Sequence, residues 1–354
     1  MVHRASTRST VPDSPGALMA AETAEQPEVW RRLLDASGPG GESGVDRVAA
    51  LVRDRSPRFV LFAARGTSDH AALYAKYLTE IRLGLPAGLV SPSTLTAYAA
   101  RPDLRDVLLV AVSQSGGSPD LLACVETARA QGALTVAVTN DARSALATAA
   151  DGHVDVLAGP ERAVAATKTY TAQLLALHLL VSAVRGEPDA GAATLPGLGE
   201  RVLAGEDAVV AVAARYRFAQ RMITTGRGYS YPAAREAALK LMETAYVSAQ
   251  AFSGADLLHG PLALVDPLVP VLAVVSPGAG GDAMAPVLAS LAARNADVLR
   301  VGGDGGLPLP GAPREELAPL LEILPMQQLA RHVAVARGGD PDAPRGLAKV
   351  TETL

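Results

Sequence analysis

The chain contains an internal repeat. FVLFAARGTSDHAALYAKYLTE (Phe59 to Glu80) and RMITTGRGYSYPAAREAALKLME (Arg221 to Glu243) both contain a β-type run, an Arg-Gly-x-Ser turn and an alanine-rich helical pattern. Two further matches share one offset of 163 residues: Ser113 aligns with Ser276, and Asp141 aligns with Asp304. Such a repeat indicates a duplicated structural unit, so the two halves are expected to share one fold.

Each half has the order strand, glycine-rich turn, helix, strand, turn, helix, strand. Short apolar runs that alternate with helical patterns are typical of a parallel sheet covered by helices on both faces. We therefore predict an α/β protein made of two tandem doubly wound parallel-sheet lobes, each a flavodoxin-like αβα sandwich.

The domain boundaries follow from this pattern. A helical arm is expected near the N-terminus, from Met19 to Leu34, after a disordered start that extends to about Pro15. We predict a start and arm at 1–45, a first lobe at 46–185, a linker at 186–205, a second lobe at 206–335 and a tail at 336–354 that closes the site.

The composition excludes several classes of function. The formal net charge is −4, which gives no basic footprint for nucleic acid. No apolar run is long enough to span a membrane and no signal-peptide core is seen, so we expect a cytoplasmic enzyme.

Cys124, the only cysteine, lies in an apolar helical pattern and is expected to be buried. No metal-binding spacing is found, and we expect neither a metal nor a cofactor.

The stretch AVSQSGGSPD (Ala111 to Asp120) places three serines and two glycines between a predicted strand and a predicted helix. Such residues are also typical of an ordinary polar turn. However, Ser118 followed by Pro119 predicts a helix start, where unpaired N–H groups and the positive end of the helix dipole bind anions. Ser113, Ser115 and Ser118 are therefore predicted to hold a phosphate ester.

The corresponding turn of the second half has lost this chemistry. Ser276 is followed there by Pro277, Gly278, Ala279 and Gly280, so we expect one anion site per chain. Two more strand-to-helix or helix-start turns, 65–68 and 165–168, are predicted to lie at the same edge of the first sheet. Lys168 in the second of these turns could instead simply pair with a carboxylate.

Three further groups are candidates for proton transfer. Glu236, Lys240 and Glu243 stand at positions i, i+4 and i+7 of one helical face. Glu236 and Lys240 could be a plain surface ion pair, whereas Glu243 is flanked by apolar residues, and partial burial suits a general base. His259 lies in a turn and could move protons, with Asp256 to orient it, or it could be a capping or packing histidine.

These stretches resemble the sugar isomerase (SIS) superfamily, above all the isomerase half of glucosamine-6-phosphate synthases and the isomerising glucosamine-6-phosphate deaminases. The resemblance extends from about Met19 to the C-terminus. The motifs that carry it are RGTSDH, SQSGGSPD, AVAATKTY, GRGYSYPAAREAALKLME, DLLHGPLAL and GLAKVTETL.

The resemblance implies a role for each matching residue. Glu243 would move a proton between C1 and C2 of the sugar, and His259 would assist ring opening from a neighbouring subunit, in a homodimer. Lys349, with Ala348 beside it, would close over the sugar. The sugar and its 6-phosphate would be held by Ser113, Gln114, Ser115, Ser118, Gly66, Thr67, Ser68 and the backbone around Val164.

The sequence also departs from the synthase pattern. Gly117, Ala166 and Arg65 stand where the synthases have a glutamate, a serine and a cysteine. SGGSPD, AVAATK and VTETL are closer to the deaminase branch. Cys124 lies in mid-chain, whereas the glutamine-hydrolysing domain of a synthase uses an N-terminal cysteine. We therefore expect that glutamine is not the ammonia source, unless a separate subunit supplies the ammonia.

Three hypotheses remain open at this point. The first is a deaminase that converts glucosamine 6-phosphate into fructose 6-phosphate and ammonia. The second uses the same base to eliminate water across C2–C3 of N-acetylglucosamine 6-phosphate. The third is a phosphosugar-sensing module without catalysis, against which Glu243, His259 and Lys349 argue.

Overall fold

The structure is a computed structural model that describes residues 14–187 and 191–349. The start of the chain that was expected to be disordered lies almost wholly outside the described residues, and the whole of VTETL lies outside them. Within the described ranges, no helix is both long and apolar enough to cross a membrane.

The first lobe contains a five-stranded parallel sheet with the strand order β2-β1-β3-β4-β5. This is the flavodoxin-like order. Its strands are β1 (Phe59–Ala63), β2 (Ala87–Leu89), β3 (Val107–Ser113), β4 (Leu134–Thr139) and β5 (Gly152–Asp155). Its helices are α3 (Val45–Arg55), α4 (Gly66–Leu78), α5 (Pro92–Leu95), α6 (Pro119–Ala130), α7 (Ala145–Ala149) and α8 (Lys168–Arg185).

The second lobe contains a four-stranded parallel sheet with the order β7-β6-β8-β9. Its strands are β6 (Arg221–Gly226), β7 (Ser248–Ser253), β8 (Val271–Val274) and β9 (Val298–Val301). Its helices are α10 (Glu206–Tyr216), α11 (Ser230–Ala245), α12 (Gly254–Leu258), α13 (Ala279–Asp282), α14 (Ala285–Ala292) and α15 (Ala318–Ala336). The predicted fold class is confirmed.

The two sheets follow the same path, as the repeat predicts. β1 and α4 correspond to β6 and α11, β3 corresponds to β8, and β4 corresponds to β9. The sequence analysis missed the edge strands β2, β5 and β7. β2 has only three residues, β5 reads GHVD and β7 reads SAQAFS, so none of them has the apolar run by which buried strands are recognised.

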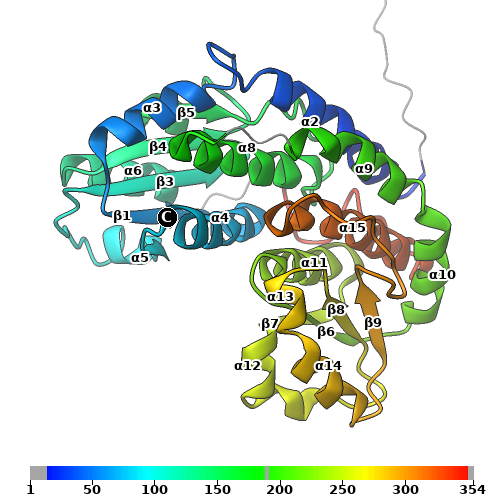
Figure 1. Cartoon of the computed structure of the whole chain (residues 1–354). Coiled ribbons are helices and arrows are strands. Elements are labelled where there is room, and N and C mark those ends of the chain that lie inside the picture. The colour runs from blue at the N-terminus through cyan, green and yellow to red at the C-terminus, as the bar shows by residue number, and fades with distance from the viewer. Residues whose placement is uncertain (1–13, 188–190, 350–354) are drawn as a thin grey trace, which may run out of the picture.

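Each sheet lies between two layers of helices. Val60, Val110 and Val136 face α3, α4 and α8, whereas Leu109 and Ala137 face α6 and α7. In the second lobe, α10, α11 and α15 cover one face and α12 and α14 cover the other. The inner helical layers of the two lobes pack on each other in one hydrophobic cluster, which places α4 beside α11 (Figure 1).

The range predicted as a linker is largely helical where the structure describes it. Helix α9 (Leu195–Leu203) buries Leu195, Leu198 and Val202, and a Cβ on Gly199 would lie 2.6 Å from the Trp30 ring. Its glycines and proline favour irregular chain, but the apolar residues at i, i+3 and i+7 give the helix a face to bury. The linker predicted at 186–205 thus contains a packed helix, and the domain boundaries stay predictions.

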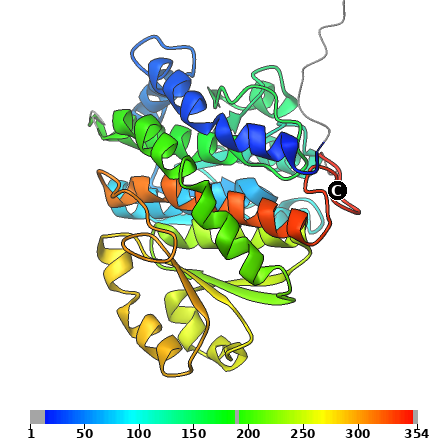
Figure 2. The same cartoon turned by 90° about the vertical axis from the view of Figure 1, so that its right-hand side faces the viewer.

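Two helices form at the predicted arm, α1 (Ala17–Ala24) and α2 (Gln26–Asp35), and they bury Met19 and Trp30. The tail after α15 returns to the start of α1. The carboxylates of Asp340 and Asp342 accept backbone N–H groups of Gly16, Leu18 and Met19. From there the tail continues to the first lobe (Figure 2).

Candidate active site

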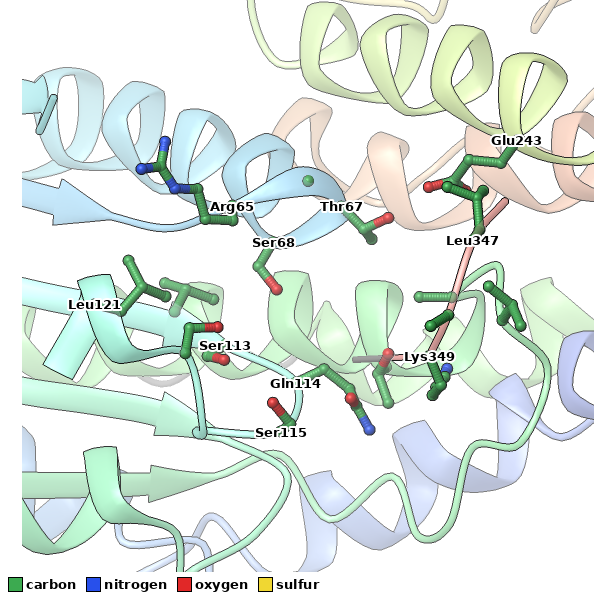
Figure 3. Close-up of a pocket in the computed structure, with 17 residues that line it drawn as sticks. Arg65, Thr67, Ser68, Ser113, Gln114, Ser115, Leu121, Glu243, Leu347 and Lys349 are labelled. Atoms are coloured by element: carbon green, nitrogen blue, oxygen red, sulfur yellow. The ribbon is translucent and has the colours of Figure 1, made fainter. Parts of the chain in front are cut away.

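A cavity of about 350 Å³ lies at the carboxyl edge of the first sheet, where α11 and the tail meet it. Eleven of the twelve residues singled out in the sequence line this cavity; the exception is His259. In Figure 3, the hydroxyls of Ser68, Ser113 and Ser115 gather at one end, and Glu243 and Lys349 lie at the other. The eleven are Gly66, Thr67, Ser68, Ser113, Gln114, Ser115, Ser118, Val164, Glu243, Ala348 and Lys349.

The serine turn is built by the end of β3 and the start of α6. The Gly116 N–H donates to Ser113 Oγ at 3.1 Å, and the Gly117 N–H donates to Ser115 Oγ at 3.3 Å. Ser118 is the N-cap of α6 without a side-chain capping bond, and Pro119 is its first residue, as predicted. These serine oxygens, together with the amide groups at the start of a 12-residue helix, can bind an anion.

A second turn, at the start of α4, borders the serine turn. Ser68 is buried, and its Oγ accepts a hydrogen bond from Gln173 Nε2 at 3.0 Å. Arg65 Nε donates to Oδ2 of the buried Asp120 at 2.7 Å, which ties this turn to the first turn of α6. The ion pair between Arg65 and Asp120 thus joins the start of α4 to the start of α6.

Glu243 enters the cavity from the second lobe. Its side chain is 23% exposed, which agrees with the partial burial expected, and its Oε2 lies 2.5 Å from Lys240 Nζ. Lys240 also lies 3.2 Å from Glu236 Oε1, and both of these side chains are completely buried. The alternative of a surface pair between Glu236 and Lys240 is therefore wrong: this pair belongs to the packed layer between α11 and α4.

Thr67 joins this ion cluster to the first lobe. Its hydroxyl donates to Glu236 Oε1 at 3.0 Å and accepts from Lys240 Nζ at 3.1 Å. Burial alone would raise the pKa of Glu236, but the charge of Lys240 and the hydrogen bond from His70 outweigh it, so this pKa lies below its ordinary value. Burial alone would lower the pKa of Lys240, but Glu236 and Glu243 outweigh it and the pKa is raised. Glu236 and Lys240 are therefore both ionised at neutral pH.

The tail reaches the cavity through Leu347, Ala348 and Lys349. Lys349 Nζ donates to Glu161 Oε2 at 2.8 Å and to the Ala163 carbonyl at 2.6 Å. The buried Glu161 also accepts the N–H groups of Thr167 and Thr169 at 3.0 and 3.1 Å, at the start of α8. One carboxylate thus caps α8 and holds the tail.

Helix α8 begins where the sequence predicts, with Thr167 as N-cap and Lys168 as first residue. Lys168 Nζ lies 2.5 Å from Glu25 Oε2, so the alternative that it pairs with a carboxylate is confirmed. Ala166, in the same turn, lines the cavity. The expected third turn is thus present, but its lysine is paired with Glu25, which lies between α1 and α2.

Sequence analysis missed two supporting residues. Glu161 lies just before AVAATKTY, and His70 is the last residue of the motif RGTSDH. His70 follows Thr67 by three residues, and that helical spacing is the signal that could have found it. Nothing in the sequence shows that Glu161 is buried.

His259 does not line the cavity. It is exposed at the C-terminal end of α12, whereas Asp256 accepts the hydroxyl hydrogen of Ser253 at 2.7 Å in the N-terminal cap of this helix. The contribution of His259 from a neighbouring subunit therefore stays a prediction.

The remaining chemistry of the described residues is modest. No group of three or more His, Cys, Asp or Glu side chains among them could hold a metal ion. Cys124 is buried, as expected, and burial raises the pKa of its thiol to about 11. A thiol of that pKa is protonated at neutral pH and is a poor nucleophile.

The chain matches known proteins over most of its length. The family model of the SIS domain matches residues 55–183 and 216–309. The glutamine–fructose-6-phosphate aminotransferase (isomerizing) of Methanothermobacter thermautotrophicus is 37% identical over 302 residues, which are 82% of this chain and 51% of the relative. The enzyme of the same name from Gloeobacter violaceus is 36% identical over 94% of this chain and 58% of its own length. The chain thus spans about half the length of these curated relatives.

Solved structures agree with this match. A candidate phosphosugar isomerase from Silicibacter pomeroyi superposes with a TM-score of 0.82 at 37% identity, over 92% of this chain and 99% of the other. The C-terminal domain of the glucosamine-fructose-6-phosphate aminotransferase from Francisella tularensis gives 0.81 at 29% identity, over 92% and 98%. The glucosamine-6-phosphate deaminase of Thermotoga maritima, at 22% identity and a TM-score of 0.79 over 95% and 100%, shares the fold. The chain therefore belongs to the SIS domain family.

Proposed function

We propose that the chain is an amino-sugar 6-phosphate isomerase and deaminase, which converts glucosamine 6-phosphate and water into fructose 6-phosphate and ammonia. One observation carries this proposal: the serine turn of the first lobe and Glu243 of the second lobe line the same cavity. Relatives named for an isomerizing reaction of fructose 6-phosphate support the substrate class.

The serine turn supplies the affinity for the phosphate. Ser113, Ser115 and Ser118 present hydroxyl oxygens beside the N-terminus of α6. A hydrogen bond to a charged group contributes about 1.5–3 kcal/mol, so several such bonds hold a phosphate ester firmly. Lys349 lies at the other end of the cavity, where it is paired with Glu161, so the phosphate is held by the serine turn.

Glu243 supplies the proton transfer. In the open-chain sugar, the carboxylate removes the proton from C2, which the C1 aldehyde acidifies, while O1 gains a proton. Return of the C2 proton to C1 leaves an iminium group at C2. Water adds to that carbon and ammonia leaves, which gives the 2-ketose. Lys240, 2.5 Å from Glu243, orients the carboxylate toward the sugar.

Two arrangements around the site are part of this proposal. His259 is supplied by the neighbouring subunit of a homodimer and helps to open the sugar ring. The tail residues Leu347, Ala348 and Lys349 cover the sugar and keep bulk water from it. No metal or organic cofactor takes part, and the enzyme acts in the cytoplasm.

A panel of hexosamine 6-phosphates, followed by mass spectrometry and an ammonia assay in D2O, tests the proposal. We expect fructose 6-phosphate, ammonia and deuterium at C1 or C2 from glucosamine 6-phosphate. Glu243→Gln should abolish turnover but keep inorganic phosphate binding. Loss of water from N-acetylglucosamine 6-phosphate without ammonia would establish the dehydratase instead. Binding without any turnover would establish a sensing module.

A further inference from the structure

A buried chain of polar contacts crosses from the first lobe to Glu243. It starts at His70 of α4, whose Nδ1 lies 2.7 Å from Glu236 Oε2. It continues through Lys240 and ends at Glu243 Oε2 in the cavity. The His70 side chain is 8% exposed and does not line the substrate cavity; it borders a separate cavity of about 710 Å³.

His70 completes the surroundings of Glu236. Oε1 of Glu236 accepts the Thr67 hydroxyl and lies beside Lys240, whereas Oε2 is held by His70. The carboxylate is completely buried while His70 is in place, so loss of the imidazole would leave Oε2 without the side-chain donor that holds it. Glu236 would then turn toward its remaining partners.

A turn of Glu236 would be transmitted to Glu243. The three ammonium hydrogens of Lys240 have three acceptors within reach, on Glu236, Thr67 and Glu243. Each hydrogen of the ammonium group is used by one of these acceptors. Lys240 therefore follows Glu236 when that carboxylate moves, and its contact with Glu243 is lost. A displacement of about 1 Å at a catalytic group can cost on the order of a hundredfold in rate.

We propose that His70 is a positioning residue for Glu243, acting through Glu236 and Lys240. This inference rests on the function proposed above. It assigns to the first lobe a second task besides phosphate binding: its helix α4 fixes the orientation of the base that the second lobe supplies.

The test compares His70→Ala, His70→Asn and a control in deuterium exchange at C2 of glucosamine 6-phosphate. We expect kcat to fall at least about tenfold in His70→Ala, with KM and the Kd for inorganic phosphate within about twofold of wild type. The amide of His70→Asn can donate near the place of Nδ1, so this variant should retain more of the rate. The control is His332→Ala. It removes the 2.8 Å contact between His332 Nε2 and Glu206 Oε1, which lies outside the site, and should keep the wild-type kcat.

An unchanged kcat in His70→Ala would overturn the inference. A parallel loss of kcat and of phosphate-binding sites per chain would instead show that His70→Ala misfolds. His70→Asn then decides: if it is folded, it must show a smaller loss in kcat alone. If the wild type exchanges no hexosamine 6-phosphate, the proposed function fails. A crystal structure of His70→Ala then decides: Glu243 should have left Lys240, and a retained 2.5 Å contact would contradict the inference.

Discussion

Lys240 is the residue on which the charge balance of the site depends. It is completely buried between Glu236 and Glu243, and removal of one partner of a buried ion pair leaves an uncompensated charge. Lys240→Met should therefore lower the free energy of unfolding by about 3–5 kcal/mol, measured by urea denaturation, and abolish turnover. The control is Lys76→Met, which breaks the exposed ion pair between Lys76 Nζ and Glu80 Oε1 at 2.7 Å. It should lower the free energy of unfolding by less than about 1 kcal/mol.

The double variant Lys240→Met/Glu236→Gln tests the reason for this loss. If the cost comes from the buried charge of Glu236, its neutralisation should restore part of the stability that Lys240→Met loses. An equal or larger loss in the double variant would mean that packing of the lysine stem, rather than its charge, stabilises the α4–α11 contact.

Glu322 on α15 should make the stability depend on pH. Burial raises its pKa from 4.5 to about 7, more than the hydroxyls of Ser230 and Ser276 lower it. Between these values the unfolded chain has lost the proton and the folded chain keeps it. The stability is therefore full below pH 4.5 and falls as the pH rises through 7, by up to about 3 kcal/mol.

Urea unfolding at pH 5.5 and pH 8.5 measures this effect. Glu322→Gln keeps a hydrogen-bonding side chain at this position and removes the titration. Its unfolding free energy should change less between the two pH values than that of wild type. The same change in both proteins would show that Glu322 does not hold its proton in the folded state.

For single residues, the sequence predicts a role where the neighbours that build the site lie close by in the chain. Ser113, Ser115 and Ser118 could be assigned because a strand, a turn and a helix start lie within a few residues. The helical spacing of His70 from Thr67 could have marked it as a neighbour of the site, but its partner could not be predicted, because Glu236 is 166 residues away and the contact depends on how two helices pack. The same holds for Glu161, whose contact with Lys349 spans 188 residues.

At the scale of the elements, the serine turn between β3 and α6 and the corresponding turn after β8 differ in the group that their N–H donors face. In the second lobe, the N–H groups of Ala279 and Gly280 donate to the Glu315 carboxylate at 2.9 and 2.8 Å. A Cβ on Gly278 would lie 2.4 Å from the Glu315 carboxyl carbon. The chain's own carboxylate thus takes the position that an anion would need, which supports the expectation of one phosphate site per chain.

The turn between β3 and α6 should be sensitive to a single methyl group. Gly116 has φ +63°, and a Cβ there would lie 2.2 Å from Ser144 Oγ. Gly116→Ala should therefore displace the turn and weaken inorganic phosphate binding at least about tenfold in calorimetry, the loss of one or more charged hydrogen bonds. Gly186→Ala is the matched control: its φ is +73° and nothing lies within 4 Å, so it should lower stability but leave phosphate binding unchanged. Equal binding by both variants would place the phosphate elsewhere.

At the scale of the whole molecule, the repeat predicts both sheets because strand order follows from topology rules that act within each half. It does not predict how the halves pack. The common hydrophobic cluster of α4, α8, α11 and α15 arises only when two helical layers meet, and that contact brings Glu243 to the serine turn. The candidate cavity is therefore a property of the assembled lobes rather than of either motif.

The position of His259 makes the subunit arrangement testable. This residue is exposed on the second lobe and outside the cavity, so a role in ring opening requires a second chain to bring it there. We expect a dimer by light scattering, and inactive Glu243→Gln and His259→Ala homodimers. Coexpression of the two variants should restore about a quarter of the wild-type activity, because half of the dimers are mixed and each has one site with both residues intact.

If Glu243 and His259 instead act within one chain, no site in the mixed dimer is complete and coexpression restores nothing. Coexpression of His332→Ala with Glu243→Gln gives the reference, since three populations of dimers then form without any change at His259. A monomer in solution that turns over glucosamine 6-phosphate would contradict the shared site, and would require His259 to be dispensable.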